Sequence, residues 1–184
     1  IITRTFGRTP AAVSSLVALA ESFALPVIEY PIPAHVNFPG GHPLHLGFDP
    51  GTLLPKADVI LVIDSDVPWA PSLHRLNGQA RVIHLGVGPL QSRYPIWGFP
   101  TTLAIAADSA VAVSLLHEAL HKRRSGKEES IARRYARLKK EHEEQRTHWR
   151  QEAEEKGRSQ TLTFEWVSYC LNQLKDEDMI FVNE

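Results

Sequence analysis

Between residues 1 and 120, short apolar runs alternate with segments whose apolar residues recur every three or four positions. The clearest run, Val59–Ile63, is uninterrupted and rich in β-branched residues, as expected for a strand that is covered on both faces. Four further runs predict strands, and they are Ile1–Arg4, Pro26–Ile28, Arg81–Leu85 and Leu103–Ala106. Short buried strands that alternate with helices predict an α/β fold with a parallel sheet.

Two helices are predicted among these strands. Thr9 and Pro10 supply an N-cap and a proline at the first helical position, and the apolar face that follows consists of Val13, Leu16, Val17, Ala20 and Phe23. Asp108 is placed to cap a second helix with an apolar side made of Val111, Leu115, Leu116 and Leu120. Between the second and third strands, residues 30–55 contain six prolines and little periodicity. An ordered loop of this length is more often a functional segment than a simple connection between strands.

A charged stretch follows this region. Residues 121–160 carry 13 Lys and Arg and eight Glu, and one apolar stripe runs through them as Ile131, Tyr135, Leu138, His142, Gln145 and Trp149. The spacing of four and three predicts a helix that packs along one seam against its own protein, and a coiled coil with a partner is the alternative. Acidic and basic residues interleave and the net charge is −1, so nucleic-acid binding is not expected.

Candidate binding residues follow two of the predicted strands. Asp64 and Asp66 come directly after Val59–Ile63, where open parallel sheets bind ligands, and could accept hydrogen bonds from ribose hydroxyls. The interpretation that we favour is that Asp64 caps the following turn and Asp66 is solvated. Gly86 and Gly88 begin like a dinucleotide fingerprint, but Gln91 stands where the third glycine belongs, which makes this motif weak.

Other reactive side chains do not form a complete catalytic set. His35, His42 and His45 share the proline-rich loop and could bind zinc or copper, although their spacing is loose and histidine is also a common polar turn residue. Cys170 lies in an apolar helical pattern around Trp166, which favours a buried structural thiol over a nucleophile. A single cysteine also fits a reducing compartment, and we therefore expect a cytoplasmic protein.

The order of several short motifs resembles the central domain of thiamine diphosphate-dependent enzymes of the acetolactate synthase type. The resemblance covers residues 1–120, and the charged stretch is followed by a segment similar to the entry into the family's diphosphate-binding domain. The motifs that carry it are Phe6-Gly7-Arg8, Leu25-Pro26-Val27, Asn37-Phe38-Pro39, Leu46-Gly47, Ala57–Ile63, Ala80–Leu85, Ile105–Asp108 and Phe164–Val167. Asp64–Trp69 is similar to a branch described as acetolactate synthase-like.

The resemblance implies a Rossmann-like three-layer sandwich with about six strands, in a carboligase or decarboxylase (a transferase or lyase). In this family the central domain is not catalytic, and thiamine diphosphate and magnesium are bound by the two flanking domains between subunits. The activating glutamate and the Gly-Asp-Gly segment that holds magnesium would therefore lie outside this chain, as would both cofactors. The implied partners are the flanking domains of the same polypeptide and further copies of it in a homo-oligomer.

Some family members bind FAD or ADP in the central domain, and the resemblance assigns candidate residues for such a nucleotide. Arg4 and Arg8 could neutralise a diphosphate at a helix N-terminus, and Gly7 is retained from the family's glycine-rich first loop. Asp64 and Asp108 are the candidate carboxylates. Gly86 and Gly88 stand where the family commonly has aspartates, which weakens the expectation of a bound nucleotide.

We therefore predict three segments: a Rossmann-like domain at 1–120, a charged helical linker at 121–158, and a C-terminal helix and strand at 159–184. The chain begins on Ile1-Ile2, ends near an apolar run at Met179–Val182, and contains no other methionine, which suggests a piece of a longer polypeptide. Apolar runs of only a few residues predict no membrane-spanning helix, which needs about 20. The alternatives are a stand-alone FAD-, ADP- or NAD-binding module and a helical scaffolding protein.

Overall fold

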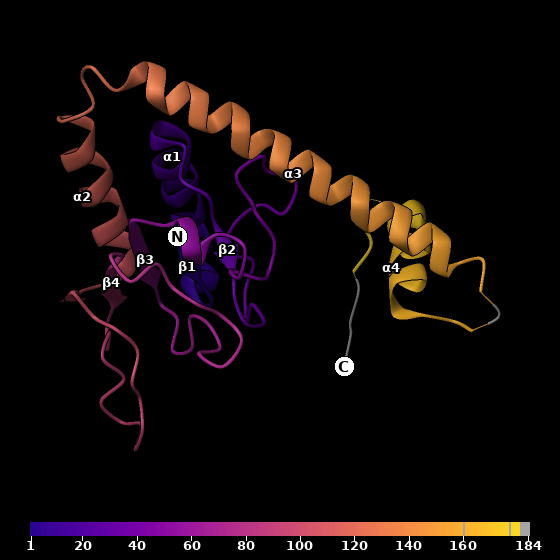
Figure 1. The fold of residues 1–184 in the computed structure, drawn as a ribbon, viewed down its shortest axis with the longest axis horizontal. Coiled ribbons are helices and arrows are strands. Elements are labelled where there is room, and N and C mark those ends of the chain that lie inside the picture. The colour runs from indigo at the N-terminus through magenta and orange to yellow at the C-terminus, as the bar shows by residue number, and fades with distance from the viewer. Residues whose placement is uncertain (160, 177, 181–184) are drawn as a thin grey trace. The chain divides into compact units, whose positions relative to one another are not determined.

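The structure is a computed structural model that describes residues 1–159, 161–176 and 178–180. It divides into two compact units, Ile1–Lys140 and Glu141–Glu184. Figure 1 follows the chain from its indigo N-terminus to its yellow C-terminal part.

The first unit is built on a parallel sheet with the strand order β2-β1-β3-β4-β5. The described residues form five strands, at the places that the apolar runs predict, where the family resemblance implies about six. Their bounds are Ile2–Thr3 (β1), Ile28–Glu29 (β2), Val59–Ile63 (β3), Arg81–Gly86 (β4) and Leu103–Ala106 (β5). The two longest strands pair in register from Val59 opposite Arg81 to Ile63 opposite Leu85. The predicted α/β fold with a parallel sheet is confirmed.

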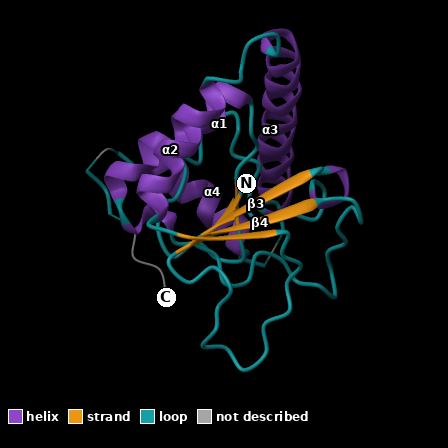
Figure 2. Ribbon diagram, turned by 90° about the vertical axis from the view of Figure 1, so that its left-hand side faces the viewer, coloured by secondary structure: helices purple, strands orange, loops and turns teal. Residues whose placement is uncertain are grey.

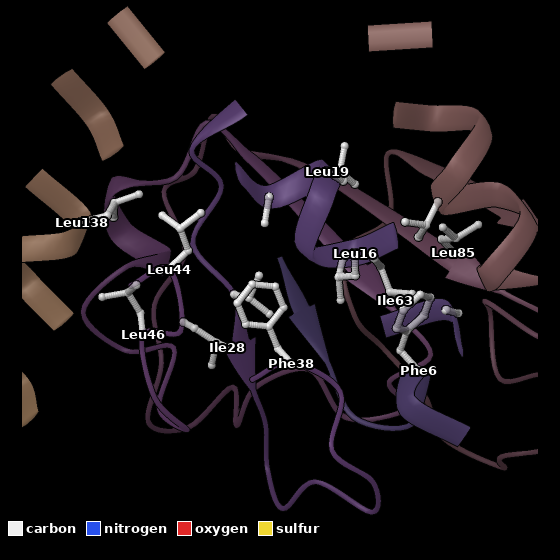
Figure 3. Close-up of a cluster of buried hydrophobic side chains, with 14 residues drawn as sticks. Phe6, Leu16, Leu19, Ile28, Phe38, Leu44, Leu46, Ile63, Leu85 and Leu138 are labelled. Atoms are coloured by element: carbon white, nitrogen blue, oxygen red, sulfur yellow. The ribbon is translucent and has the colours of Figure 1, made fainter. Parts of the chain in front are cut away.

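Two helices, α1 (Val13–Phe23) and α2 (Ser109–His121), cover one face of the sheet. Figure 2 shows both of them on one side of β3 and β4, with loops on the other side. Helix α1 begins at Val13 because residues 10–12 form a short 3-10 helix, η2 (Pro10–Ala12). Asp108 caps α2 as predicted, since its side chain accepts a hydrogen bond from Val111 N at 3.1 Å. The core beneath these helices includes Phe6, Leu16, Leu19, Ile63 and Leu85 (Figure 3). Val113 belongs to the same cluster.

Loops and a 3-10 helix, η3 (Leu54–Lys56), form the layer on the opposite face. Trp69 is the largest buried side chain there, and it packs with Ile60, Val62 and Val82 of the sheet. Pro68 and Pro71 follow β3 closely. Proline lacks the N–H that a helix interior needs, so this connection between β3 and β4 packs as a loop.

The first part of helix α3 (Glu128–Lys156) packs against the body of the first unit. Leu138 is 0% exposed within the core cluster, and Tyr135 packs against the same cluster. Figure 3 shows Leu138 beside Leu44. Arg134 donates hydrogen bonds to the carbonyl oxygens of Phe23 and Ala24, at 2.7 and 3.1 Å, where α1 ends. The predicted seam is therefore confirmed for this part of the helix.

The second unit contains the rest of α3 and helix α4 (Phe164–Leu174). The indole ring of Trp166 stacks on the ring of Tyr169, and Lys156 Nζ lies 2.5 Å from Glu165 Oε1. No residue of α4 is fully buried in the described part of this unit, so the prediction of a buried thiol at Cys170 is wrong: its side chain is half-exposed. Met179 and Ile180 form no strand, and the rest of that predicted strand, 181–182, lies outside the described residues.

None of the helices in the described part of the chain is long and apolar enough to span a membrane.

Candidate functional site

A pocket of about 270 Å³ opens at the carboxyl ends of β1, β3 and β4. The pocket lies at the switch point of the sheet, where the strand order reverses: β2 lies on one side of β1 and β3 lies on the other. Ligands of open parallel sheets bind at such a point. The polar residues that line the pocket are Arg4, Thr5, Arg8, Asp64, Ser65, Asp66, His84, Gln91 and Tyr94.

The backbone conformation and backbone hydrogen bonds of Asp64 fix this residue at the end of β3. Its φ of 47° lies in the left-handed region, which aspartate tolerates better than most residues. Its N–H donates to Leu85 O at 3.0 Å, and its carbonyl oxygen accepts from Thr5 N at 3.2 Å and Thr5 Oγ1 at 2.9 Å. A Cβ at Gly86 would lie 2.8 Å from Asp64 Oδ1, so glycine at this position makes room for the carboxylate.

The Asp64 carboxylate is almost fully buried, with a side chain that is 3% exposed. It accepts a hydrogen bond from the Ser109 hydroxyl, and Arg8 Nη2 lies 3.5 Å from Oδ2. Burial raises the pKa of Asp64, and the nearby Asp108 carboxylate raises it further. The Ser109 hydrogen bond and the Arg8 charge lower it by less, so the pKa stays above its ordinary value.

We expect the stabilising contribution of Asp64 to decrease as the pH rises. Because its folded-state pKa is raised, the folded protein holds this proton more tightly than the unfolded chain does. The contribution is largest below the unfolded-state pKa of about 3.9 and is lost as the pH rises through the folded-state pKa. Asp64→Asn cannot titrate. Urea unfolding should therefore show wild-type stability declining relative to Asp64→Asn as the pH rises above about 4.

The exposed Asp58→Asn serves as the control for removing an acid outside the pocket. A wild-type to Asp64→Asn difference that is the same at every pH would contradict the raised pKa of Asp64.

Asp66 connects the end of β1 to the loop that follows β4. Arg4 Nη1 donates to its Oδ1 at 3.1 Å, and the Tyr94 hydroxyl donates to its Oδ2 at 2.8 Å. Trp97 Nε1 donates to the Asp66 carbonyl oxygen at 2.6 Å. Burial alone raises the pKa of Asp66, but the hydrogen bonds and the Arg4 charge outweigh it and hold the pKa below its ordinary value. Asp66 is therefore a carboxylate that its neighbours keep ionised.

A second buried polar cluster fixes the proline-rich loop. The Asn37 side chain donates to Glu29 Oε1 at 2.8 Å and accepts from Gly7 N at 2.9 Å, and His45 Nε2 lies 3.0 Å from Glu29 Oε2. Burial by itself raises the pKa of Glu29, but the hydrogen bonds from His45 and Asn37 together outweigh it and lower the pKa. This cluster ties the loop to the ends of β1 and β2.

The loop histidines do not converge on a common point. His45 contacts Glu29, whereas His42 Nε2 lies 3.2 Å from Glu21 Oε1. Across residues 1–159, 161–176 and 178–180, no group of three or more His, Cys, Asp or Glu side chains could hold a metal ion. The loop histidines therefore form no three-ligand cluster among the described residues.

The structure brings together three of the five predicted nucleotide-binding residues. Arg4, Arg8 and Asp64 line the pocket, whereas Gly7 packs against the loop and Asp108 caps α2. Their binding of a nucleotide stays a prediction. Sequence reasoning missed the partners of Asp64 and Asp66, which are Ser109 and Tyr94, and also the pocket residues Ser65 and His84. Ser109 and Tyr94 reach the site through contacts that are distant in sequence, which no local motif marks. Ser65 and His84 lie within the quoted motifs Asp64–Trp69 and Ala80–Leu85, but nothing in those motifs marks them as pocket residues.

Comparison with known proteins supports the fold. No family model matches this chain, and no curated protein does. Among solved structures, it is similar to a Mycobacterium smegmatis protein assigned as a thiamin diphosphate-dependent enzyme, with a TM-score of 0.50 and 20% identity. The match covers 64% of this chain and 24% of that one, so the chain spans about a quarter of its neighbour's length. At this identity the likeness shows a shared fold.

Proposed function

We propose that this chain is the central, non-catalytic domain of a thiamine diphosphate-dependent carboligase or decarboxylase that resembles acetolactate synthase. The observation that carries the proposal is the shared fold over 64% of the chain with a segment of a protein assigned to thiamin diphosphate chemistry. The matched segment is about a quarter of that protein, as expected for one domain of a larger enzyme. The order of motifs along residues 1–120 supports the same assignment.

The described residues of this chain do not fit thiamine diphosphate with magnesium. Mg²⁺ requires oxygen ligands in a near-octahedral arrangement, and it usually joins a protein carboxylate to the phosphates of its ligand. Asp64 and Asp66, the carboxylates of the pocket, are instead engaged by Arg8 and Arg4. Within the described residues no cluster of three acidic or histidine side chains could hold the ion. We therefore assign both cofactors to flanking domains outside this chain.

In this proposal the domain positions the catalytic domains of a homo-oligomer, and its proline-rich loop lines the approach of the substrate. The loop suits this role because it is ordered by buried contacts instead of by its own secondary structure. Asn37 is 0% exposed and joins the loop to Glu29 and Gly7. A segment fixed in this way can present a defined surface to a neighbouring domain.

The coding sequence on either side of this segment tests the proposal. We expect an upstream domain with a glutamate at the end of a strand, and a downstream Gly-Asp-Gly segment that is followed by an asparagine. The glutamate would activate the cofactor and the downstream segment would hold magnesium. Stop codons that closely flank the 184 residues, or neighbouring domains without both features, would contradict the proposed function.

A further inference from the structure

We propose that the switch-point pocket binds a neutral, hydroxyl-bearing molecule about the size of a monosaccharide and that it rejects nucleoside diphosphates. The proposal concerns the pocket between β1, β3 and β4 only, and it holds whether or not the chain is part of a thiamine diphosphate enzyme.

The first argument is the charge of the pocket. Its two arginines face its two aspartates, with Arg4 Nη1 3.1 Å from Asp66 Oδ1 and Arg8 Nη2 3.5 Å from Asp64 Oδ2. The charges of these four side chains cancel. A diphosphate that took either arginine would leave a carboxylate beside it, and like charges at such distances repel strongly where water is scarce. The pocket therefore offers a diphosphate no net attraction.

The second argument concerns the backbone near β1. Diphosphates bind where glycines let the chain come close and where free N–H groups point at the phosphate. Gly7 does not serve this purpose, because a Cβ there would overlap the backbone carbonyl group of Val36, and its own N–H donates to Asn37 Oδ1. Helix α1 begins only at Val13, behind two 3-10 helices. At Gly7, the loop therefore occupies the space through which a diphosphate would approach the backbone.

The third argument is the uncharged polar groups that line the pocket. His84 Nε2 donates to Pro100 O at 3.1 Å, which makes Nδ1 of the neutral ring an acceptor. Burial lowers the pKa of His84 and favours this neutral form. Nδ1 of His84 and Oγ of Ser65 are buried and have no hydrogen-bond partner in the part of the chain that the structure describes. A buried polar group without a partner is destabilising. Both atoms belong to residues that line the pocket, so a ligand hydroxyl that reached either atom would satisfy it.

The pocket also limits ligand size. At about 270 Å³ it is slightly smaller than the roughly 300–1,000 Å³ of pockets for drug-sized ligands. The Gln91 carboxamide at its lining can both donate and accept, as hydroxyls require, and the half-exposed Tyr94 adds an aromatic ring at the rim. Hydroxyls both donate and accept, so a small polyol or sugar matches this mixture of groups.

Ligand-observed NMR on the 184-residue chain tests the proposal, with myo-inositol, D-ribose and ADP as probes. We expect saturable binding of inositol or ribose and no saturable binding of ADP. Ser65→Ala should weaken the binding at least fivefold, whereas the exposed Ser14→Ala should leave it unchanged. ADP binding tighter than that of the neutral probes, or binding of no probe at all, would overturn the proposal.

A second experiment tests the charge argument by asking whether removal of the two pocket carboxylates creates binding of pyrophosphate. Asp64→Asn with Asp66→Asn changes the sum of the four pocket charges from zero to two positive charges. We expect this double variant to bind inorganic pyrophosphate at least tenfold more tightly than the wild type. Asp49→Asn with Asp58→Asn, at two exposed positions, is the matched control.

Circular dichroism checks that the double variant is folded. If the double variant does not fold, the single variant Asp66→Asn, which frees only Arg4, is tested in its place. Equal pyrophosphate affinity in the folded variant and the wild type would overturn the charge argument. Neither outcome depends on thiamine diphosphate, so a failure here is distinct from a failure of the proposed function.

Discussion

Leu138→Asp is expected to lower the free energy of unfolding by roughly 3–5 kcal/mol. The Leu138 side chain is 0% exposed and belongs to the same core cluster as Leu44 and Leu46. The substitution removes apolar contacts and places a carboxylate where it has no partner, which is among the most destabilising changes in a protein core. Urea unfolding followed by circular dichroism at pH 7 measures the effect.

Ala132→Asp is the matched control, because it introduces the same side chain at an exposed position of the same helix. It should change stability by less than about 1 kcal/mol. The contrary outcome is that Leu138→Asp unfolds at the same urea concentration as the wild type and changes the oligomeric state. In that case the apolar stripe of α3 packs against a helix of a partner, and our assignment of the seam is wrong.

Gly7→Ala is expected to destabilise the first unit by about 2–4 kcal/mol. A Cβ at Gly7 would lie 2.7 Å from the backbone carbonyl carbon of Val36 and 3.1 Å from Asn37 N. Backbone atoms cannot swing aside as the end of a flexible side chain can, so the proline-rich loop has to move. That movement would also strain the hydrogen bond from Gly7 N to Asn37 Oδ1. Thermal unfolding by circular dichroism measures the loss.

Gly78→Ala is the control for this prediction, since a Cβ at that position meets no atom within 4 Å. We expect it to unfold within a few degrees of the wild type. Equal melting temperatures for the two variants would show that the loop does not approach Gly7 as closely as the structure has it.

The sheet could be predicted from the sequence because its strands carry a local signal. Val59–Ile63 is apolar throughout and β-branched at every residue but Leu61, as expected for a strand that is covered on both faces. The cap at Asp108 is equally local, because the acceptor and the N–H of Val111 are three residues apart. The stripe through Leu138 has helical spacing, so its buried side was also predictable.

The contacts that shape the site could not be predicted in this way. Asn37 binds Glu29 and Gly7, and Tyr94 reaches Asp66 across 28 residues of chain. Each pair is brought together by the order of strands in the sheet and not by sequence spacing. The same holds for the partners of the two arginines: the sequence indicates positive charge near a helix start, whereas the structure pairs that charge with carboxylates.

Isothermal titration with thiamine diphosphate and magnesium tests the central claim most directly, on the 184-residue chain and on the whole polypeptide that contains it. The account predicts saturable binding of one cofactor per chain to the whole polypeptide and no binding to the 184 residues. The reason is that the described residues offer no oxygen cluster for the magnesium-bound diphosphate. Saturable binding of one cofactor per 184-residue chain at micromolar affinity, or no binding to the whole polypeptide, would contradict it.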